Sequence, residues 1–399
     1  MKKSKLGQFY TPDNISKLMA KLITSPSTKE PLNIIDMACG TGSLLTPLQK
    51  ILPNSNFEAC DIDSENIEYL NKKHPNWDKK NINALSQEFK KEFYDIAVGN
   101  PPFIKTKTTS HIANLIERNY ESTSLKNSST VRAEIVFIAK YIESTKIGGM
   151  VSLIIPESIV SNEKMKFVRT FIFKNLSNIR LYEISSRYFD SAEVKTYLIS
   201  GRKTVNPDHN ISIGHVTANG DIIDDREISK KFCIERADIK YLSHLEQIKE
   251  MRAKYLSLGD LTSSINRGNK TKNQLEKENT VFFHTSSFKE FTSSNIELEG
   301  NLDLIKKYSP KHVAQKSDIL IPRIGRKCHQ HQVFISEGNA VVTDSVFRLN
   351  VPESLALKVF DALQTEENQF WRDLHSKGSC TKLLTTQDIF NMPLVGLTR

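Results

Sequence analysis

The chain has 399 residues and a formal net charge of +9, a basic excess that permits binding to a polyanion without proving it. Its composition, 38% hydrophobic and 25% charged, is that of globular proteins, and no apolar run approaches the roughly 20 residues that span a bilayer. Five scattered cysteines without a CxxC pair argue against structural zinc and a disulfide framework, so we expect no metal site, no membrane partner and a cytoplasmic location.

The first two hundred residues alternate short apolar runs with segments of helical spacing. This alternation, with nearly continuous apolar strands, predicts a parallel α/β sheet covered on both faces. The last two strands follow each other without a helix, so we expect them to pair antiparallel at one edge. The expected strands are 33–38, 56–63, 94–100, 148–156, 178–185 and 194–201. The expected helices are 43–52, 64–74, 133–145 and 163–176.

The pattern changes in the second half of the chain. Turn signals after residue 202 predict a connection with a small hairpin, and the β/α alternation is lost beyond about 245. Short strands, polar turns and later helices then predict a smaller mixed α+β domain. We therefore expect a catalytic domain at 1–240 and a second domain at 241–399.

The sequence DMACGTG at 36–42 joins the first strand to a helix. Gly40 and Gly42 allow a ligand to approach the backbone, but Leu45 stands where a dinucleotide fingerprint has its third glycine. Asp61 ends the second strand, where a carboxylate can accept both hydroxyls of a ribose. Asp36 would then lie beside a cationic group, and adenosine with a cationic tail describes S-adenosylmethionine. Strand-end capping is the alternative role for each aspartate.

The sequence VGNPPF at 98–103 ends the third strand on Asn100. Two consecutive prolines cannot donate to a strand ladder, so the turn after Asn100 is rigid. Such a turn fixes an amide side chain and backbone carbonyls in space. The polar segment 105–131 follows it, at the end of a strand where α/β proteins place substrate contacts. A structural turn and a surface loop without function are the alternatives.

Three motifs occur in a defined order: GQFYTP at 7–12, DMACGTG at 36–42 and NPPF at 100–103. Together they resemble the gamma class of DNA adenine-N6 methyltransferases over roughly residues 5 to 200. The resemblance implies a doubly wound methyltransferase sheet, S-adenosylmethionine as cofactor and double-stranded DNA as substrate. It also implies methyl transfer to N6 of an adenine that is flipped out of the duplex.

The resemblance also assigns roles to single residues. The side-chain oxygen of Asn100 and the carbonyl of Pro101 would accept the two N6 hydrogens in a turn completed by Pro102, and Phe103 would stack on the adenine. Phe189 would pack against the flipped base. The family usually has aspartate where this chain has Asn83. The residues expected to bind the cofactor are Thr11, Pro12, Asp36, Ala38, Gly40, Gly42, Asp61, Ile62 and Asn83.

Two segments of the second half, 316–332 and 381–397, resemble the target-recognition domains of type I restriction specificity subunits. The resemblance implies the modification component of a restriction or defence system, with a cognate endonuclease or specificity subunit as a further partner. Arginine can read guanine, and both basic side chains can bind phosphates. The residues expected to bind DNA are Arg267, Lys270, Lys272, Arg323, Arg326 and Lys327.

Other functions remain open at this point. NPPF also occurs in RNA adenine-N6 methyltransferases and in glutamine methyltransferases that act on release factors. The chain could instead be an inactive DNA-specificity module that keeps a methylase fold. A fused restriction–modification enzyme is less favoured, because the sequence has no convincing carboxylate–carboxylate–lysine nuclease signature, and we expect no DNA cleavage.

Overall fold

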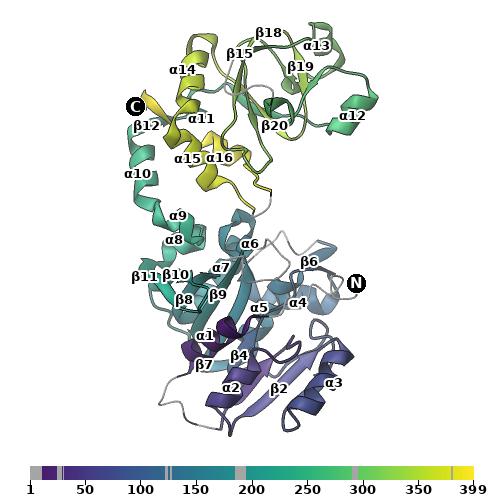
Figure 1. The fold of residues 1–399 in the computed structure, drawn as a ribbon, viewed down its shortest axis with the longest axis vertical. Coiled ribbons are helices and arrows are strands. Elements are labelled where there is room, and N and C mark those ends of the chain that lie inside the picture. The colour runs from purple at the N-terminus through teal and green to yellow at the C-terminus, as the bar shows by residue number, and fades with distance from the viewer. Residues whose placement is uncertain are drawn as a thin grey trace. The chain divides into compact units, whose positions relative to one another are not determined.

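The computed structural model describes residues 11–24, 29, 31–121, 125, 128–184, 195–289, 295–378 and 381–399. The chain divides into two compact units, Met1–Leu242 and Ser243–Arg399 (Figure 1). This division lies two residues from the boundary expected at 240/241. In the described parts of both units, every helix is too short or too polar to cross a bilayer.

The first unit is built on a nine-stranded sheet in the order β11-β10-β8-β9-β7-β4-β1-β2-β3. Neighbouring strands from β3 to β7 are parallel, whereas β9 is antiparallel to both β7 and β8, and β11 is antiparallel to β10. The strands are β1 Asn33–Asp36, β2 Asn56–Asp61, β3 Asp78–Asn81, β4 Tyr94–Gly99, β7 Thr145–Pro156, β8 Leu176–Ile184, β9 Thr196–Lys203, β10 Asn210–Val216 and β11 Ile222–Ser229.

Helices cover both faces of this sheet (Figure 1). Side chains alternate along each strand, so Ile34 packs with the helices of one face and Ile35 with those of the other. This confirms the predicted doubly wound α/β fold. One face carries α1 Asp13–Ile23, α2 Leu45–Ile51 and α3 Ser64–Lys73. The other carries α4 Ser110–Asn119, α5 Ala133–Ser144, α7 Lys166–Asn175 and α8 Lys230–Glu235.

Two local expectations were wrong, and one strand was missed. The antiparallel pair β8–β9 forms, but it is not at an edge, because the small hairpin expected after residue 202 adds β10 and β11 to the sheet. The polar segment 105–131 contains α4, whose Ile112, Leu115 and Ile116 are buried. The short strand β3 was missed because its sequence, DKKN, is polar and has no buried residue.

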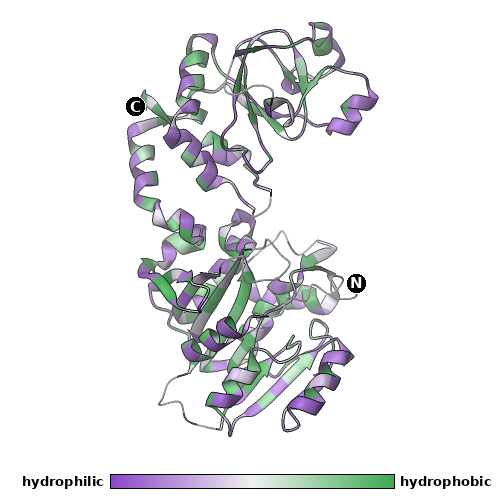
Figure 2. Ribbon diagram, viewed as in Figure 1, coloured by the Kyte–Doolittle hydropathy of each residue, from purple (hydrophilic) through white to green (hydrophobic). Residues whose placement is uncertain are grey.

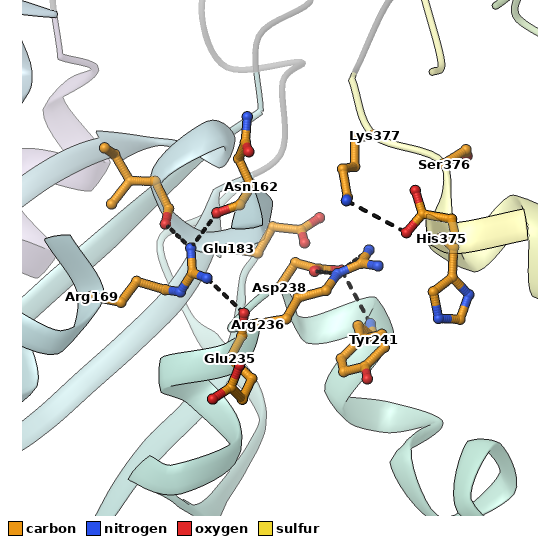
Figure 3. Close-up of polar contacts among 12 residues, drawn as sticks. Asn162, Arg169, Glu183, Glu235, Arg236, Asp238, Tyr241, His375, Ser376 and Lys377 are labelled. Atoms are coloured by element: carbon orange, nitrogen blue, oxygen red, sulfur yellow. Dashed lines mark hydrogen bonds and ion pairs between the residues drawn. The ribbon is translucent and has the colours of Figure 1, made fainter. Parts of the chain in front are cut away.

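Arg169 on α7 connects the end of α8 to residues 159–162 (Figure 3). Its guanidinium is 1% exposed and donates to four backbone carbonyls, those of Ile159, Asn162, Ile234 and Glu235, at 2.6–2.9 Å. Burial lowers the pKa of Arg169 to about 10. Since a buried cation needs such acceptors, these bonds help to hold α8 in the first unit.

The second unit contains a five-stranded sheet in the order β13-β20-β17-β18-β15, and a three-stranded sheet, β14-β19-β16. Hydrophobic residues gather along the strands of both units, whereas helix α12 (Lys272–Lys277) is hydrophilic (Figure 2). The mixed α+β prediction is confirmed. The elements of these sheets are β13 Ser264–Arg267, β14 Phe282–Phe283, β15 Asn295–Glu297, β16 Val313–Ala314, β17 Ile319–Pro322, β18 Val333–Glu337, β19 Ala340–Val342 and β20 Val346–Asn350. Two further strands pair antiparallel, β12 Tyr255–Ser257 and β21 Pro393–Thr398. The longer helices of this unit are α10 Leu245–Lys254, α14 Glu353–Gln364 and α15 Glu366–His375.

Candidate active site

A cavity of the first unit lies at the carboxyl ends of β1, β2 and β4, where the strand order reverses on the two sides of β1. Ligands of doubly wound folds bind at such switch points. The predicted site residues that line it are Thr11, Asp36, Ala38, Gly40, Asp61, Ile62, Asn83, Asn100 and Pro102. Further lining residues, not predicted, are Met37, Cys39, Ser43, Leu44, Ile82, Ala84, Leu85, Ile104 and Phe137.

The glycine turn after β1 is shaped by its surroundings. Gly42 has φ +79°, and a Cβ there would lie 2.9 Å from both Leu70 Cδ2 and Trp77 Cζ3. Gly40 has φ +53°, and its N–H donates to Asp61 Oδ2 at 2.7 Å. Gly42 therefore allows the turn to pack against Leu70 and Trp77, and it does not line the cavity. Asp61, at the end of β2, holds the turn through its hydrogen bond with Gly40.

Asp61 has the strand-end capping role that the sequence left open as the alternative. Its Oδ2 accepts from Gly40, and its Oδ1 accepts from the N–H of Asp63 at 2.8 Å. A carboxylate oxygen has two lone pairs, so each can still accept a ligand hydroxyl. Ile62 beside it is 55% exposed although it is apolar, which suits contact with a planar ring. The ribose contact of Asp61 stays a prediction.

Asp36 is 1% exposed at the end of β1. Its Oδ1 accepts from the N–H of Ala38 at 3.0 Å and from the hydroxyl of Tyr141 at 3.1 Å. The pKa of Asp36 is raised to about 7, mainly by burial and to a smaller extent by the charge of Asp61, and the two hydrogen bonds oppose the rise. A cation bound beside Asp36 would favour its ionised form.

Tyr141 on α5 joins the two halves of the site, and sequence reasoning missed it. Its hydroxyl accepts from the N–H of Met37 at 2.9 Å as well as donating to Asp36. A Cβ on Gly99 would lie 2.3 Å from the same hydroxyl oxygen. Tyr141 thus contacts the end of β1 and the residue before Asn100 at once. The available signal was a tyrosine among the apolar residues that α5 buries against the sheet.

The Asn-Pro-Pro-Phe turn is connected to the N-terminal motif. The side-chain N–H of Asn100 donates to Oγ1 of Thr11 at 3.2 Å, which fixes the orientation of the amide. Pro101 is buried, and Phe103 is partly buried against the core on the α1–α3 face. Pro12, Pro101 and Phe103 do not line the cavity. Phe189 lies outside the described residues.

The remaining wall of the cavity comes from residues 82–85. Asn83 is exposed, and its Oδ1 accepts from the N–H of Leu85 at 3.1 Å, so this oxygen stabilises a local turn. Lys140 on α5 donates to the carbonyls of Ala84, at 2.7 Å, and Gln87. Burial and the charge of Arg118 lower the pKa of Lys140 to about 8. The wall is therefore attached to the same helix as Tyr141.

The charge of the cavity indicates which ligand it fits. The described lining residues include the carboxylates of Asp36 and Asp61 and no lysine, arginine or histidine. Such a site disfavours a phosphate and suits a nucleoside with a cationic tail, so the residues fit S-adenosylmethionine. Among the described residues, no three histidines, cysteines or acids lie close enough together to hold a metal ion.

Residues 1–212 match the model of the family described as N-6 DNA Methylase. The chain belongs to the N-6 DNA Methylase family. It is 29% identical over 175 residues to the type II methyltransferase M.HincII of Haemophilus influenzae, an alignment that covers 44% of this chain and 32% of that one. It is 26% identical over 196 residues to M.AccI of Acinetobacter calcoaceticus, covering 48% and 35%. The chain thus spans about a third of these relatives.

A solved structure extends the likeness in fold beyond the N-6 DNA Methylase region. The type IIG restriction endonuclease BpuSI matches with a TM-score of 0.51 and 16% identity. The match covers 97% of this chain and 59% of that one. Both units therefore have counterparts in fold, which at this identity says nothing about shared activity.

The second unit lies outside the N-6 DNA Methylase match, and its predicted DNA-binding residues differ in their contacts. Arg267 ends β13 and Arg323 follows β17, at the same end of the five-stranded sheet. Burial and the nearby charge of Arg267 lower the pKa of Arg323. Arg326 and Lys327 are exposed. In contrast, Lys270 pairs with Glu278 at 2.6 Å and Lys272 with Glu276 at 3.5 Å.

Proposed function

We propose that the chain is an S-adenosylmethionine-dependent DNA methyltransferase that modifies N6 of adenine. One observation carries the proposal: a cavity whose described lining has two carboxylates and no cationic side chain adjoins the Asn-Pro-Pro-Phe turn, and Asn100 bonds directly to Thr11 of the N-terminal motif. Membership of the N-6 DNA Methylase family supports it.

In this proposal the cavity residues bind and orient the cofactor. Asp61 accepts the ribose hydroxyls, Ile62 packs on the adenine ring, and Asp36 faces the cationic tail, while Asn83 contacts the adenine amine. Pro12 fixes the start of α1 behind Thr11. The cofactor supplies a methyl group made electrophilic by a sulfonium. The chain itself contributes position and charge.

The catalytic turn prepares the target nitrogen. The N6 lone pair of adenine is delocalised into the ring, so the amine is a poor nucleophile. Acceptors at the Asn100 side chain and the Pro101 carbonyl would hold its two hydrogens and favour a tetrahedral nitrogen. Phe103, and Phe189 as predicted from the sequence, would hold the flipped base by stacking, worth about 1–3 kcal/mol per base.

The second unit would choose the DNA sequence, with Arg267, Arg323, Arg326 and Lys327 as the first candidates. Two relatives are named type II methyltransferases, and the matched structure is a type IIG restriction endonuclease. These names support a place in a restriction–modification system, with a cognate endonuclease or specificity subunit as partner.

The test is methyl transfer from labelled S-adenosylmethionine to duplex DNA that lacks adenine methylation, followed by nucleoside analysis. We expect N6-methyladenine from the wild type and none from Asn100→Ala. Label in RNA or in protein glutamine instead of DNA would move the assignment to those substrates. Cofactor binding without turnover on any of the three would indicate an inactive specificity module.

A further inference from the structure

A short antiparallel ribbon follows the catalytic turn directly. Its strands are β5, Lys105–Lys107, and β6, Thr130–Arg132, which come from the two ends of the polar segment. The N–H of Ala133, next to β6, donates to the carbonyl of Ile104 at 2.8 Å. Ile104 lines the cavity next to Pro102. The ribbon is therefore fixed to the site where the target base would be held.

The two faces of the ribbon differ. Thr106 pairs with Val131, which is 4% exposed and belongs to the core. Lys105 pairs with Arg132 and Lys107 with Thr130, so these side chains lie on the opposite face because strand side chains alternate. Lys105 and Lys107 are exposed, and Arg132 is partly exposed. We call Lys105, Lys107 and Arg132 the basic face.

The charges of the basic face are only partly balanced. Lys105 lies directly opposite Arg132, and like charges in this register destabilise a ribbon. Arg132 pairs through Nε with Glu134, a fully buried acid of α5. Neither Lys105 nor Lys107 makes a side-chain ion pair with a described residue. An anion bound at this face would balance the two lysines and relieve the repulsion between Lys105 and Arg132.

We propose that the basic face binds the phosphate backbone of duplex DNA beside the adenine held in the catalytic turn. This inference rests on the proposed function and adds a DNA contact in the first unit, separate from the second. The ribbon begins two residues after Phe103, so a phosphate bound there belongs to a nucleotide close to the flipped base. Phosphate contacts set the register of the DNA and carry no sequence information.

The experiment compares Lys105→Ala/Lys107→Ala with the wild type in DNA binding across a salt series. Each phosphate contact contributes about 0.9 to the slope of log affinity against log salt, so the slope should fall by about 2. The loss should be similar for cognate and unrelated duplexes. Lys105→Arg/Lys107→Arg should keep the slope, and Lys72→Ala/Lys73→Ala, which removes two exposed lysines of α3, should leave it unchanged.

The controls separate this inference from the proposed function. Cofactor binding without DNA should be the same in the alanine variant and the wild type, and the far-UV spectrum should be unchanged. An unchanged salt slope, in a system where the wild type methylates DNA, would overturn the role of the basic face. Loss of cofactor binding in the alanine variant would also overturn it, because the ribbon would then be structural. Absence of N6-methyladenine from the wild type would count against the proposed function itself.

Discussion

The two units place their charged groups in opposite ways. In the first, Asp36 and Asp61 are buried, and both accept hydrogen bonds from backbone N–H groups of the turns around them. In the second, Arg326 and Lys327 are exposed, and Lys270 and Lys272 are paired with acids. The carboxylates of the first unit accept hydrogen bonds from turns whose residues form a sequence motif, so the motif specifies the site. A cation on the surface of the second unit can instead be neutralised by a neighbouring acid, so its presence in the sequence does not specify a binding site.

The largest expected effect tests the first unit. Asn100→Ala removes the acceptor for one N6 hydrogen, and losses of this kind lower kcat by about 100- to 1000-fold or more. Cofactor affinity should change less than about threefold, because the carboxylates of Asp36 and Asp61 and the glycine turn that would bind the cofactor are kept in the variant. Single-turnover methylation and calorimetric titration measure the two quantities. Activity near wild type would remove Asn100 from the mechanism.

Asp61→Ala should have the next largest effect, on cofactor binding. It removes the proposed ribose contact and leaves the N–H of Gly40 without its acceptor, which together should raise the cofactor Kd by about 10- to 100-fold. Asp63→Ala is the matched control. The Asp63 side chain caps α3 by accepting a hydrogen bond from the N–H of Glu65. Its removal should lower the free energy of unfolding by about 1 kcal/mol and leave the cofactor Kd unchanged. Equal Kd values for the two variants would contradict the cofactor role of Asp61.

The pH dependence of cofactor binding tests Asp36. Its raised pKa means that the protonated form stabilises the fold. That contribution is full below the ordinary value of 3.8 and is lost as the pH rises through about 7. A cationic ligand favours the ionised form, so the increase in Tm on adding S-adenosylmethionine should be larger at pH 8 than at pH 6. The neutral product S-adenosylhomocysteine should show a weaker dependence.

Tyr141→Phe sharpens this test. Asp61, Cys39 and Cys60 are the other titratable groups near Asp36, and burial keeps both thiols protonated by raising their pKa. Because the Tyr141 hydroxyl lowers the pKa of Asp36, its removal should shift the midpoint of the pH profile upward. A uniform loss of affinity without a shift would mean that Tyr141 only supports the glycine turn.

The sequence predicted the first unit better than the second for physical reasons. Strand–helix alternation and the glycine and proline motifs restrict the backbone, so they predicted the sheet and most cavity residues. Tyr141 and Lys140 escaped prediction because their contacts depend on how α5 packs against the sheet. In the second unit the pairing of Lys272 with Glu276, one helical turn away, was visible in the sequence, whereas the approach of Arg267 to Arg323 depends on the sheet.

The smallest expected effects distinguish the cations of the second unit. Arg323→Ala removes a partly buried guanidinium beside Arg267 and should weaken cognate DNA binding by about 1–3 kcal/mol if it contacts a base. Lys270→Ala should cost less than about 1 kcal/mol, since Glu278 already neutralises this lysine on the surface. Fluorescence anisotropy with cognate duplex at fixed salt measures both. The opposite result, a larger loss from Lys270→Ala than from Arg323→Ala, would mean that Lys270 leaves Glu278 and binds a phosphate in the complex. Ion pairs in the free protein would then not distinguish the cations that bind DNA from those with a structural role.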